Sequence, residues 1–459
     1  MGVLPRPARH GVLAIAAVSG MVLLAGMNAA EPAAARVSSG SAVPASSGGA
    51  RQWVSFYTGP GANDDFSDSV AVAHSGSAVF VTGNSSSAPG IFDYATVGYN
   101  ASTGAKLWAR RYDGTGGAGG NALAVAVDPA GRKVFVTGYS PGPGSGTNYV
   151  TIAYNAATGA RLWLSRYDGP VSSNDYAYDV AVSPDGSKVF VTGSSQGGPA
   201  ASKGDYATVA YDAATGTQLW VSRYSGPGAS EDIATSLVVG PHAAAVYVTG
   251  GSGNDYATVA YNAATGAQRW VSRRAGYARS IAVGAGGHTV YVTGTSGGDS
   301  GESFATVAYG AATGAQRWVS RYNGAGRSGS RANSLAVSPS GGMVYVTGAA
   351  ALDYATVAYS AATGARRWVR RYDGGESDSG ARQVAVGPRG RTVYITGGSG
   401  SDFATIAYNA ATGARRWVRR YPGAGIALAV SPVTGTVFVS GLTDRATSFR
   451  DYATIAYHG

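Results

Sequence analysis

The stretch DYATVAYSAATGARRWVRRY, residues Asp353 to Tyr372, decides the fold of this 459-residue chain. Side chains at alternate positions of a strand share a face, and both faces of the first half, DYATVAY, are fairly apolar. This pattern predicts a strand between two neighbouring sheets. The next residues, SAATG, supply the small residues and the glycine of a hairpin turn. A second strand follows, and its Trp368 offers a large flat surface for packing between sheets.

Copies of this stretch recur along the whole chain. Each of the eight tryptophans lies in an RWVSRY-like segment, and two further strand signals separate one such segment from the next DYAT copy. Four strands per roughly 40 to 50 residues are typical of a β-propeller blade. The tryptophans are Trp53, Trp108, Trp163, Trp220, Trp270, Trp318, Trp368 and Trp417. The sequence therefore predicts an all-β, eight-bladed propeller with four antiparallel strands per blade.

The two ends of the repeat region complement each other. The first repeat segment, Gln52 to Tyr57, is a tryptophan strand without a preceding DYAT strand, whereas the last, Asp451 to Tyr457, is a DYAT strand without a following tryptophan strand. We expect these two strands to pair in the last blade, because closure removes the exposed edges of an open array. The propeller is predicted to span residues 51–459 as one domain.

The residues before the propeller have the features of an export signal. Arg6 and Arg9 precede an apolar run from Gly11 to Met27, and small residues follow up to position 35. We interpret residues 1–35 as a cleaved signal peptide and residues 36–50 as a flexible linker, which predicts a secreted or extracytoplasmic protein. The alternative is an uncleaved membrane anchor.

Composition excludes several kinds of site. The chain has no cysteine, so disulfides, thiolate metal sites, a cysteine nucleophile and lipoprotein acylation are excluded. Three histidines, His74, His242 and His288, fall in turns of different blades, which predicts no metal site. Six aspartates begin a third strand, and we expect their carboxylates to accept hydrogen bonds from nearby backbone N–H groups. A ring of calcium sites is the alternative for these residues, Asp93, Asp205, Asp255, Asp353, Asp402 and Asp451.

Two motifs carry a family resemblance. Residues 407–417, AYNAATGARRW, resemble the tryptophan-docking motif of the PQQ-like, quinoprotein-type eight-bladed propellers, and residues 183–193, SPDGSKVFVTG, are similar to the YVTN-type repeat. The resemblance implies two kinds of relative. Some are dehydrogenases that hold pyrroloquinoline quinone with calcium, and others are envelope assembly or interaction scaffolds. No position here matches the catalytic or calcium-binding carboxylates, so we expect a binding scaffold without a cofactor. A quinone-dependent dehydrogenase or a hydrolase built from loop carboxylates is the alternative.

Charge suggests a further property. The formal net charge is +10, and arginines concentrate in the tryptophan strand, which should be the outermost strand of each blade. Cationic side chains there discourage edge-to-edge pairing. They could equally form a basic rim that binds anionic polymers weakly by charge. No specific nucleic-acid binding is expected, and the protein is predicted to be a monomer.

The loops predict where a ligand would bind. One face carries short, uniform turns of the SPDG and NAATG kinds, and the other carries loops of variable length and sequence. Loops on a rigid scaffold often carry function, so a protein, glycan or other cell-envelope polymer is expected at the variable face, around the mouth of the central channel. Random variation at unconstrained positions is the alternative explanation. The candidate ligand-binding residues are Asp68, Tyr178, Arg279, Asn333 and Arg382.

Overall fold

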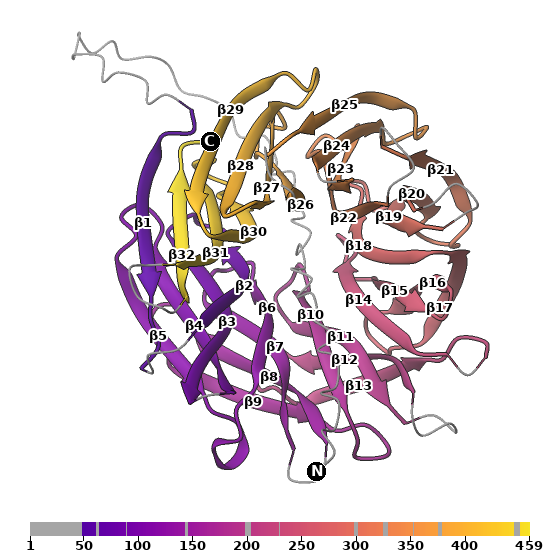
Figure 1. Cartoon of the computed structure of the whole chain (residues 1–459). Helices are drawn as coiled ribbons and strands as arrows, with labels where there is room; N and C mark the ends of the chain where they lie inside the picture. Colours follow the sequence, from indigo (N-terminus) through magenta and orange to yellow (C-terminus); the bar gives the residue numbers. More distant parts are fainter. Residues whose placement is uncertain are drawn as a thin grey trace, which may run out of the picture.

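The computed structural model confirms the predicted architecture (Figure 1). It describes residues 48–60, 64–88, 90–142, 146–197, 203–228, 230–297, 302–324, 329–351, 353–374, 379–444 and 450–459. The predicted signal peptide and most of the predicted linker lie outside these residues. Eight four-stranded antiparallel sheets are arranged around one axis, and we call them blades 1 to 8.

Seven blades each take four consecutive strands. Blades 1 to 4 are β2 (Asp65–Val72), β3 (Ala78–Ala88), β4 (Ile91–Asn100) and β5 (Lys106–Tyr112); β6 (Asn121–Val127), β7 (Lys133–Pro141), β8 (Thr147–Asn155) and β9 (Arg161–Tyr167); β10 (Asp175–Val182), β11 (Lys188–Gln196), β12 (Gly204–Asp212) and β13 (Gln218–Tyr224); and β14 (Asp232–Val239), β15 (Ala245–Ser252), β16 (Asp255–Asn262) and β17 (Gln268–Ala275). Blades 5 to 7 are β18 (Tyr277–Val283), β19 (Thr289–Ser296), β20 (Ser303–Gly310) and β21 (Gln316–Tyr322); β22 (Ser330–Val337), β23 (Met343–Ala350), β24 (Asp353–Ser360) and β25 (Arg366–Tyr372); and β26 (Ser379–Val386), β27 (Thr392–Ser399), β28 (Asp402–Asn409) and β29 (Arg415–Pro422).

Blade 8 is built from both ends of the repeat region. Its strands, from the axis outward, are β30 (Ala424–Val430), β31 (Val437–Asp444), β32 (Arg450–Tyr457) and β1 (Arg51–Tyr57). The described part of the chain contains one helical element, the 3₁₀ turn η1 (Thr115–Gly117). Among the described residues, no helix has the length and apolar character needed to span a bilayer.

The first strand of each blade lies nearest the axis, and the tryptophan strand lies at the perimeter, as predicted (Figure 1). The first strands of neighbouring blades contact one another, as β2 does with β6 and with β30. The turns between the first and second strands and between the third and fourth strands share one face, the turn face. The remaining loops lie on the opposite face, which we call the loop face.

The core is divided among the blade junctions. Each of eight clusters of buried apolar side chains combines residues from two adjacent blades. In β24, for example, seven of the eight residues are buried, because both faces of the strand pack against neighbouring sheets. A single blade therefore buries little by itself and depends on its neighbours.

The tryptophans connect successive blades on the turn face. The indole N–H of Trp368 in blade 6 donates a 3.0 Å hydrogen bond to the carbonyl of Ala410 in blade 7. The Trp368 ring lies on Gly413, in the turn that follows Ala410. Gly413 has a φ of 72°, and an added Cβ on it would lie 2.8 Å from the ring, so this position does not accommodate a side chain. Six further pairs form the same bond at 2.8–3.3 Å: Trp53–Ala101, Trp108–Ala156, Trp163–Ala213, Trp220–Ala263, Trp270–Ala311 and Trp318–Ala361.

Blade 8 closes the ring without a covalent turn, in a region we call the seam. Strand β1 pairs antiparallel with β32, as predicted. Gly49 donates its backbone N–H to the carbonyl of His458, and His458 donates to the carbonyl of Ala50. Gly49 has a φ of 80° and packs against the ring of Trp417. The last residues of the predicted linker thus occupy the place that the Thr-Gly turn has in the other blades.

One prediction for the repeat aspartates was wrong. Five of the six form ion pairs with an arginine 18 residues later in the outermost strand, rather than relying on backbone N–H groups. The backbone donors nearby are occupied by the sheet ladder, whereas the guanidinium offers free, charged donors to the carboxylate. The pairs are Asp93–Arg111 (2.6 Å), Asp205–Arg223 (3.0 Å), Asp255–Arg273 (3.2 Å), Asp353–Arg371 (2.7 Å) and Asp402–Arg420 (3.4 Å).

Candidate functional site

Every innermost strand contains a β-bulge near the loop face. The pairing between the first and second strands of each blade skips one residue of the first strand. In β10, for example, Ala177 pairs with Gly193 and Asp179 with Thr192, so that Tyr178 is left unpaired. Bulges often redirect a side chain near a functional site. The eight bulge residues are Asp68, Leu123, Tyr178, Thr235, Arg279, Asn333, Arg382 and Ile426.

A glycine in the second strand makes each bulge possible. An added Cβ on Gly193 would lie 1.9 Å from the carbonyl oxygen of Tyr176, which presses against the glycine where the bulge distorts the strand. The equivalent glycine in the other seven blades faces a carbonyl at 1.9–2.2 Å: Gly83, Gly138, Gly250, Gly294, Gly348, Gly397 and Gly441. The repeated VTG-like tripeptide is therefore a sequence signal for the bulge, and we missed it.

All five predicted site residues occupy bulge positions, in blades 1, 3, 5, 6 and 7. Sequence reasoning missed the other three members of the set, Leu123, Thr235 and Ile426. Each of the five belongs to a different blade. Asn333 uses its side-chain N–H to bond the carbonyl of Ala381 in the next blade at 2.7 Å, so this residue also has a structural role.

Asp68 is the one acidic bulge residue. It is buried and accepts a 2.9 Å hydrogen bond from the side-chain amide of Asn84. Burial raises the pKa of Asp68 to about 8, and the positive charge of Arg382 partly opposes this rise. Asp68 lies in blade 1 and Arg382 in blade 7, so blade 8 separates the two in the order of the ring.

The residue that follows the bulge has a structural function. In five blades its side-chain oxygen accepts a backbone N–H from the innermost strand of the next blade. Asp179 is the charged member: it accepts from the backbone of Leu237 at 2.8 Å and of Val180 at 2.7 Å. Burial raises the pKa of Asp179 to about 7. Because these bonds occupy its carboxylate and it is almost inaccessible, this perturbed pKa reflects packing rather than acid–base chemistry.

Aromatic side chains gather at the loop-face ends of the inner strands. The rings of Tyr139 and Tyr176 meet edge-to-face with centroids 4.8 Å apart, and the guanidinium of Arg279 lies 5.5 Å from the centre of the Tyr277 ring. Aromatic residues and arginine are enriched in protein interfaces and in their energetically dominant positions. Tyr176 and Tyr277 each lie two residues before a bulge, a position that sequence reasoning did not single out.

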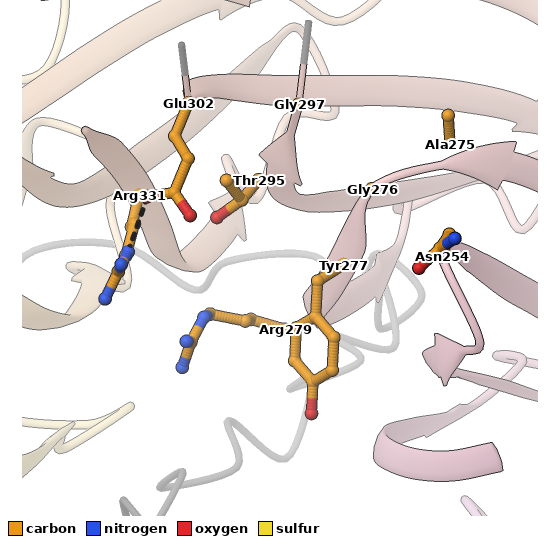
Figure 2. A pocket seen from close by; sticks show the side chains of 9 residues that line it. All are labelled: Asn254, Ala275, Gly276, Tyr277, Arg279, Thr295, Gly297, Glu302 and Arg331. Carbon is orange, nitrogen blue, oxygen red and sulfur yellow. Dashed lines mark hydrogen bonds and ion pairs between the residues drawn. The ribbon is translucent and has the colours of Figure 1, made fainter. Parts of the chain in front are cut away.

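A pocket of about 600 Å³ lies on this face at blade 5 (Figure 2). Its volume is within the range of small-ligand and side-chain binding pockets. Figure 2 shows Tyr277 and Arg279 on one side of the pocket, and Glu302 with Arg331 on the other. Glu302 and Arg331 form a 2.7 Å ion pair between half-exposed side chains. The pocket is also lined by Asn254, Ala275, Gly276, Thr295 and Gly297.

Arg279 gives the pocket its electrostatic character. Within the part of the chain that the structure describes, its Nε is buried and has no hydrogen-bond partner. Burial lowers the pKa of Arg279, although a guanidinium stays charged at neutral pH. Its neighbour Arg331 is already paired with Glu302, which leaves Arg279 as a partly buried cation beside an aromatic ring. Such a group favours an oxyanion from a ligand, because a charge-assisted hydrogen bond would offset the cost of its burial.

The described residues do not fit a calcium–quinone site. Calcium takes six to eight oxygen ligands, with several carboxylates among them. The bulge positions supply a single carboxylate, Asp68, whose raised pKa favours its protonated form at neutral pH. Across the described ranges, no group of three or more His, Asp or Glu side chains is arranged to hold a metal ion. We therefore derive no quinone chemistry for this chain.

Comparison with known proteins agrees with the fold. The profile of the family described as outer membrane protein assembly factor BamB matches residues 93–273 and 254–453. No curated protein matches the sequence. Among solved structures, Sqt1 from Chaetomium thermophilum bound to the N-terminus of ribosomal protein L10 has 12% identity and a TM-score of 0.60, over 89% of this chain and 100% of that one.

Two further structures are similar. The quinohemoprotein alcohol dehydrogenase from Comamonas testosteroni has 14% identity and a TM-score of 0.56, over 88% of this chain and 76% of that one. BamB from Moraxella catarrhalis has 16% identity and a TM-score of 0.49, over 89% and 97%. At these identities the structural likeness shows the propeller fold alone.

Proposed function

Since the chain belongs to the family described as outer membrane protein assembly factor BamB, we propose that it is an exported, non-catalytic binding propeller that recognises a partner protein on its loop face. The partner anchors a carboxylate-bearing segment in the pocket at blade 5. Residues 1–35 direct the chain out of the cytoplasm, and the propeller acts as a rigid platform for the loop-face residues.

The observation that carries this proposal is Arg279. Its Nε is buried and has no hydrogen-bond partner among the described residues, and its guanidinium lies beside the Tyr277 ring. This requires a reason, because a buried donor without a partner is unfavourable. An aspartate, glutamate or terminal carboxylate from a partner would accept two parallel N–H bonds from the guanidinium. Tyr277 would then cover the apolar part of the bound segment.

Two further features favour a protein segment as the ligand. The aromatic pairs of the loop face extend from blade 1, where Phe66 meets Phe92, through the Tyr139–Tyr176 pair to Tyr277. This spread suits an extended segment better than a compact metabolite. A propeller of this fold, Sqt1, is bound to the N-terminus of a ribosomal protein, which is a precedent for the binding mode and not for the partner.

The enzyme alternatives have less support. Four buried carboxylates have raised pKa values. Asp68 and Asp179 accept hydrogen bonds from Asn84 and from the backbone, and Asp65 accepts the backbone N–H of Gly59 at 2.6 Å. Asp175 likewise accepts the backbone N–H of Gly169 at 2.7 Å. These contacts stabilise the inner strands and explain the burial of the carboxylates without a catalytic role.

The test uses fluorescein-labelled hexaglutamate as the probe and fluorescence anisotropy as the readout. The wild-type protein should bind the peptide, and Arg279→Gln should weaken binding about tenfold or more, since hydrogen bonds to charged groups contribute roughly 1.5–3 kcal/mol. The matched control is Arg132→Gln, which removes the same charge from an exposed arginine on the turn face and should change affinity less than about twofold.

Two results would contradict the proposal. If the two variants weaken binding equally, the peptide responds to net charge and not to the pocket. If hexalysine binds as well as hexaglutamate, the pocket does not select carboxylates. Measuring Tyr277→Leu in parallel tests the aromatic cover: an unchanged affinity would remove Tyr277 from the site.

A further inference from the structure

A second surface, on the turn face of blades 6 and 7, is strongly basic. Six exposed arginines belong to it, and none of them forms an ion pair with a carboxylate in the described part of the chain. We call this set the arginine patch: Arg366, Arg367, Arg389, Arg391, Arg415 and Arg416. Because blade 7 contributes four of the six, the patch is concentrated on one side of the ring.

Hydrogen bonds within blade 7 and between blades 6 and 7 link the segments that carry the patch. Arg416 donates to the backbone carbonyl of Arg391 at 3.2 Å, which joins the outer strand of blade 7 to its first turn. Arg370 of blade 6 donates to the carbonyls of Thr412 and Gly413, the turn that leads directly into Arg415. Strand β25 is therefore in contact with the turn that precedes β29.

The repeat does not need these arginines in order to fold. The positions equivalent to Arg367 and Arg416 hold leucine in blades 1 to 3, and those leucines, Leu107, Leu162 and Leu219, are 45–47% exposed. Blade 3 has the uncharged pair Gln218 and Leu219 at this end of its outer strand. Protection of an edge strand therefore does not require a pair of arginines, and this weakens that explanation for the patch.

The turns around the arginine patch also lack acidic residues that are present in the turns of other blades. On the turn face, blades 2 and 3 carry Asp128, Asp185 and Asp212. The corresponding turns of blades 6 to 8, residues 338–342, 360–365, 387–391, 409–414 and 431–436, contain neither aspartate nor glutamate. The positive potential around the arginine patch is thus not compensated locally.

A groove adjoins the patch at the seam. It has a volume of about 450 Å³ and is lined by Arg415, Arg416 and Trp417, with Asn409, Ala414, Gly48 and Gly459. It lies where the split turn of blade 8 meets blade 7. Two guanidinium groups and the edge of an indole at one place can bind a charged group and the less polar unit attached to it.

We propose that the arginine patch and this groove bind a linear polymer with repeated phosphate groups. Guanidinium groups form bidentate hydrogen bonds with phosphate, and no lysine occurs after residue 203, so the cations of this half are all of the kind that suits this geometry. The six arginines belong to two outer strands and one turn of neighbouring blades, so a flexible chain can contact them in succession. Binding here is independent of the pocket at blade 5.

The test measures binding of long-chain inorganic polyphosphate as a function of salt. The variant replaces Arg366, Arg367, Arg415 and Arg416 with glutamine. Its control replaces Lys106, Arg132, Arg161 and Arg269, which are also exposed, so that both proteins lose four positive charges. At 100 mM salt the patch variant should bind more than tenfold more weakly, and the control less than about threefold. Four lost phosphate contacts should reduce the slope of log affinity against log salt by about three.

Each other outcome overturns the proposal in a defined way. Equal weakening of both variants would mean that net charge alone attracts the polymer. Equal binding of polyglutamate would show that phosphate is not selected. Binding to anionic lipid vesicles but not to polyphosphate would assign the patch to a membrane. A double variant in the turn, Arg389→Gln with Arg391→Gln, gives a second measurement if the fourfold variant does not fold, and the proposal fails if this variant binds like the wild type.

Discussion

The turn face and the loop face of this propeller are built from the same strands, but only one of them is uniform. On the turn face, seven junctions share one indole-to-carbonyl bond, and each of those tryptophans lies on a glycine with a φ of 68–75°. On the loop face, eight equivalent bulges carry seven kinds of side chain. The difference shows how the repeat separates stability from recognition: the bulge needs only a glycine opposite it, so its own side chain can vary.

The largest effect should come from opening the ring. Deleting residues 51–57 from a protein that begins at residue 36 removes β1, leaves the edge of β32 unpaired and takes Trp53 out of the junction between blades 8 and 1. The free energy of unfolding should fall by more than the roughly 3–5 kcal/mol expected for one buried tryptophan. Thermal and urea unfolding measure the loss. A deletion protein that unfolds like its parent would show that closure adds nothing to the turn-face junctions.

The next effect tests one junction. Trp368→Ala should cost about 3–5 kcal/mol, because it creates a cavity between blades 6 and 7 and removes one of the two donors to the carbonyl of Ala410, the other being the hydroxyl of Tyr345. Urea unfolding gives the difference in free energy. Leu107→Ala, at an exposed position next to Trp108, is the control and should stay within about 0.5 kcal/mol. Similar losses for both would mean that the tryptophan is not part of the core.

A pair of glycine substitutions compares the two faces directly. Gly413→Ala should cost about 2 kcal/mol or more, since a left-handed conformation alone costs roughly 1–2 kcal/mol for a residue with a Cβ and the new methyl group would press on Trp368. Gly398→Ala, near the loop face, meets open space and should be close to neutral. Differential scanning calorimetry measures the difference in melting temperature between the two variants. Equal melting temperatures would contradict the prediction that only Gly413 requires a glycine.

The sign of a pH effect should also differ between the faces. The pKa of Asp68 is raised to about 8 by burial, so its contribution to stability is complete below pH 4 and is lost as the pH rises through 8. Asp68→Asn should therefore raise the melting temperature at pH 9 and change it little at pH 4. On the turn face, the hydroxyl of Ser183 lowers the pKa of Asp185, so Asp185→Asn should instead be slightly destabilising above pH 4. Matching pH profiles for the two variants would contradict this assignment.

The smallest effect concerns the candidate site. Arg279→Gln should change the free energy of unfolding by no more than about 0.5 kcal/mol, because its buried Nε has no hydrogen-bond partner to lose in the described part of the chain. Arg273→Gln, which breaks bonds to Tyr224, Ser252 and Asp255, should cost about 1–3 kcal/mol. Chemical denaturation of the two variants separates a binding arginine from a structural one. A large loss for Arg279→Gln would give it a structural role.

Much of the fold could be predicted from the sequence because repetition multiplies weak signals. A single DYAT strand or tryptophan is ambiguous, but eight tryptophans at nearly constant spacing require eight equivalent environments. The missing partners of Gln52–Tyr57 and Asp451–Tyr457 also indicated closure. The register of the strands could not be predicted from the sequence in the same way. The ion pairs were missed although Asp93 and Arg111, like four other pairs, lie at the same separation along the chain, because a contact across strands depends on register and not on composition.

The positions of the candidate site residues could be predicted from the sequence, but the contacts among them could not. Position in the repeat was sufficient to identify Asp68, Tyr178, Arg279, Asn333 and Arg382 as members of one structural set. It could not show that Asn333 forms a hydrogen bond to the next blade, or that the Nε of Arg279 has no hydrogen-bond partner among the described residues. That distinction depends on distances between different blades. The pocket beside Tyr277 likewise depends on residues from three neighbouring blades, whose proximity is set by the packing of whole sheets.

The pairing of β1 with β32 also constrains how the molecule forms. These strands are separated by nearly the whole propeller sequence, and contacts between such distant segments form slowly because a long loop must close first. During synthesis from the N-terminus, blades 1 to 7 can stack in order as each is completed. Strand β1 with Trp53 cannot pair until the C-terminal strand β32 has been made. Until then, the growing array has an unpaired strand at one end and an unfilled junction at the other. The ring can therefore close only after β32 has been synthesised. Until then, incomplete chains remain accessible to proteases and chaperones.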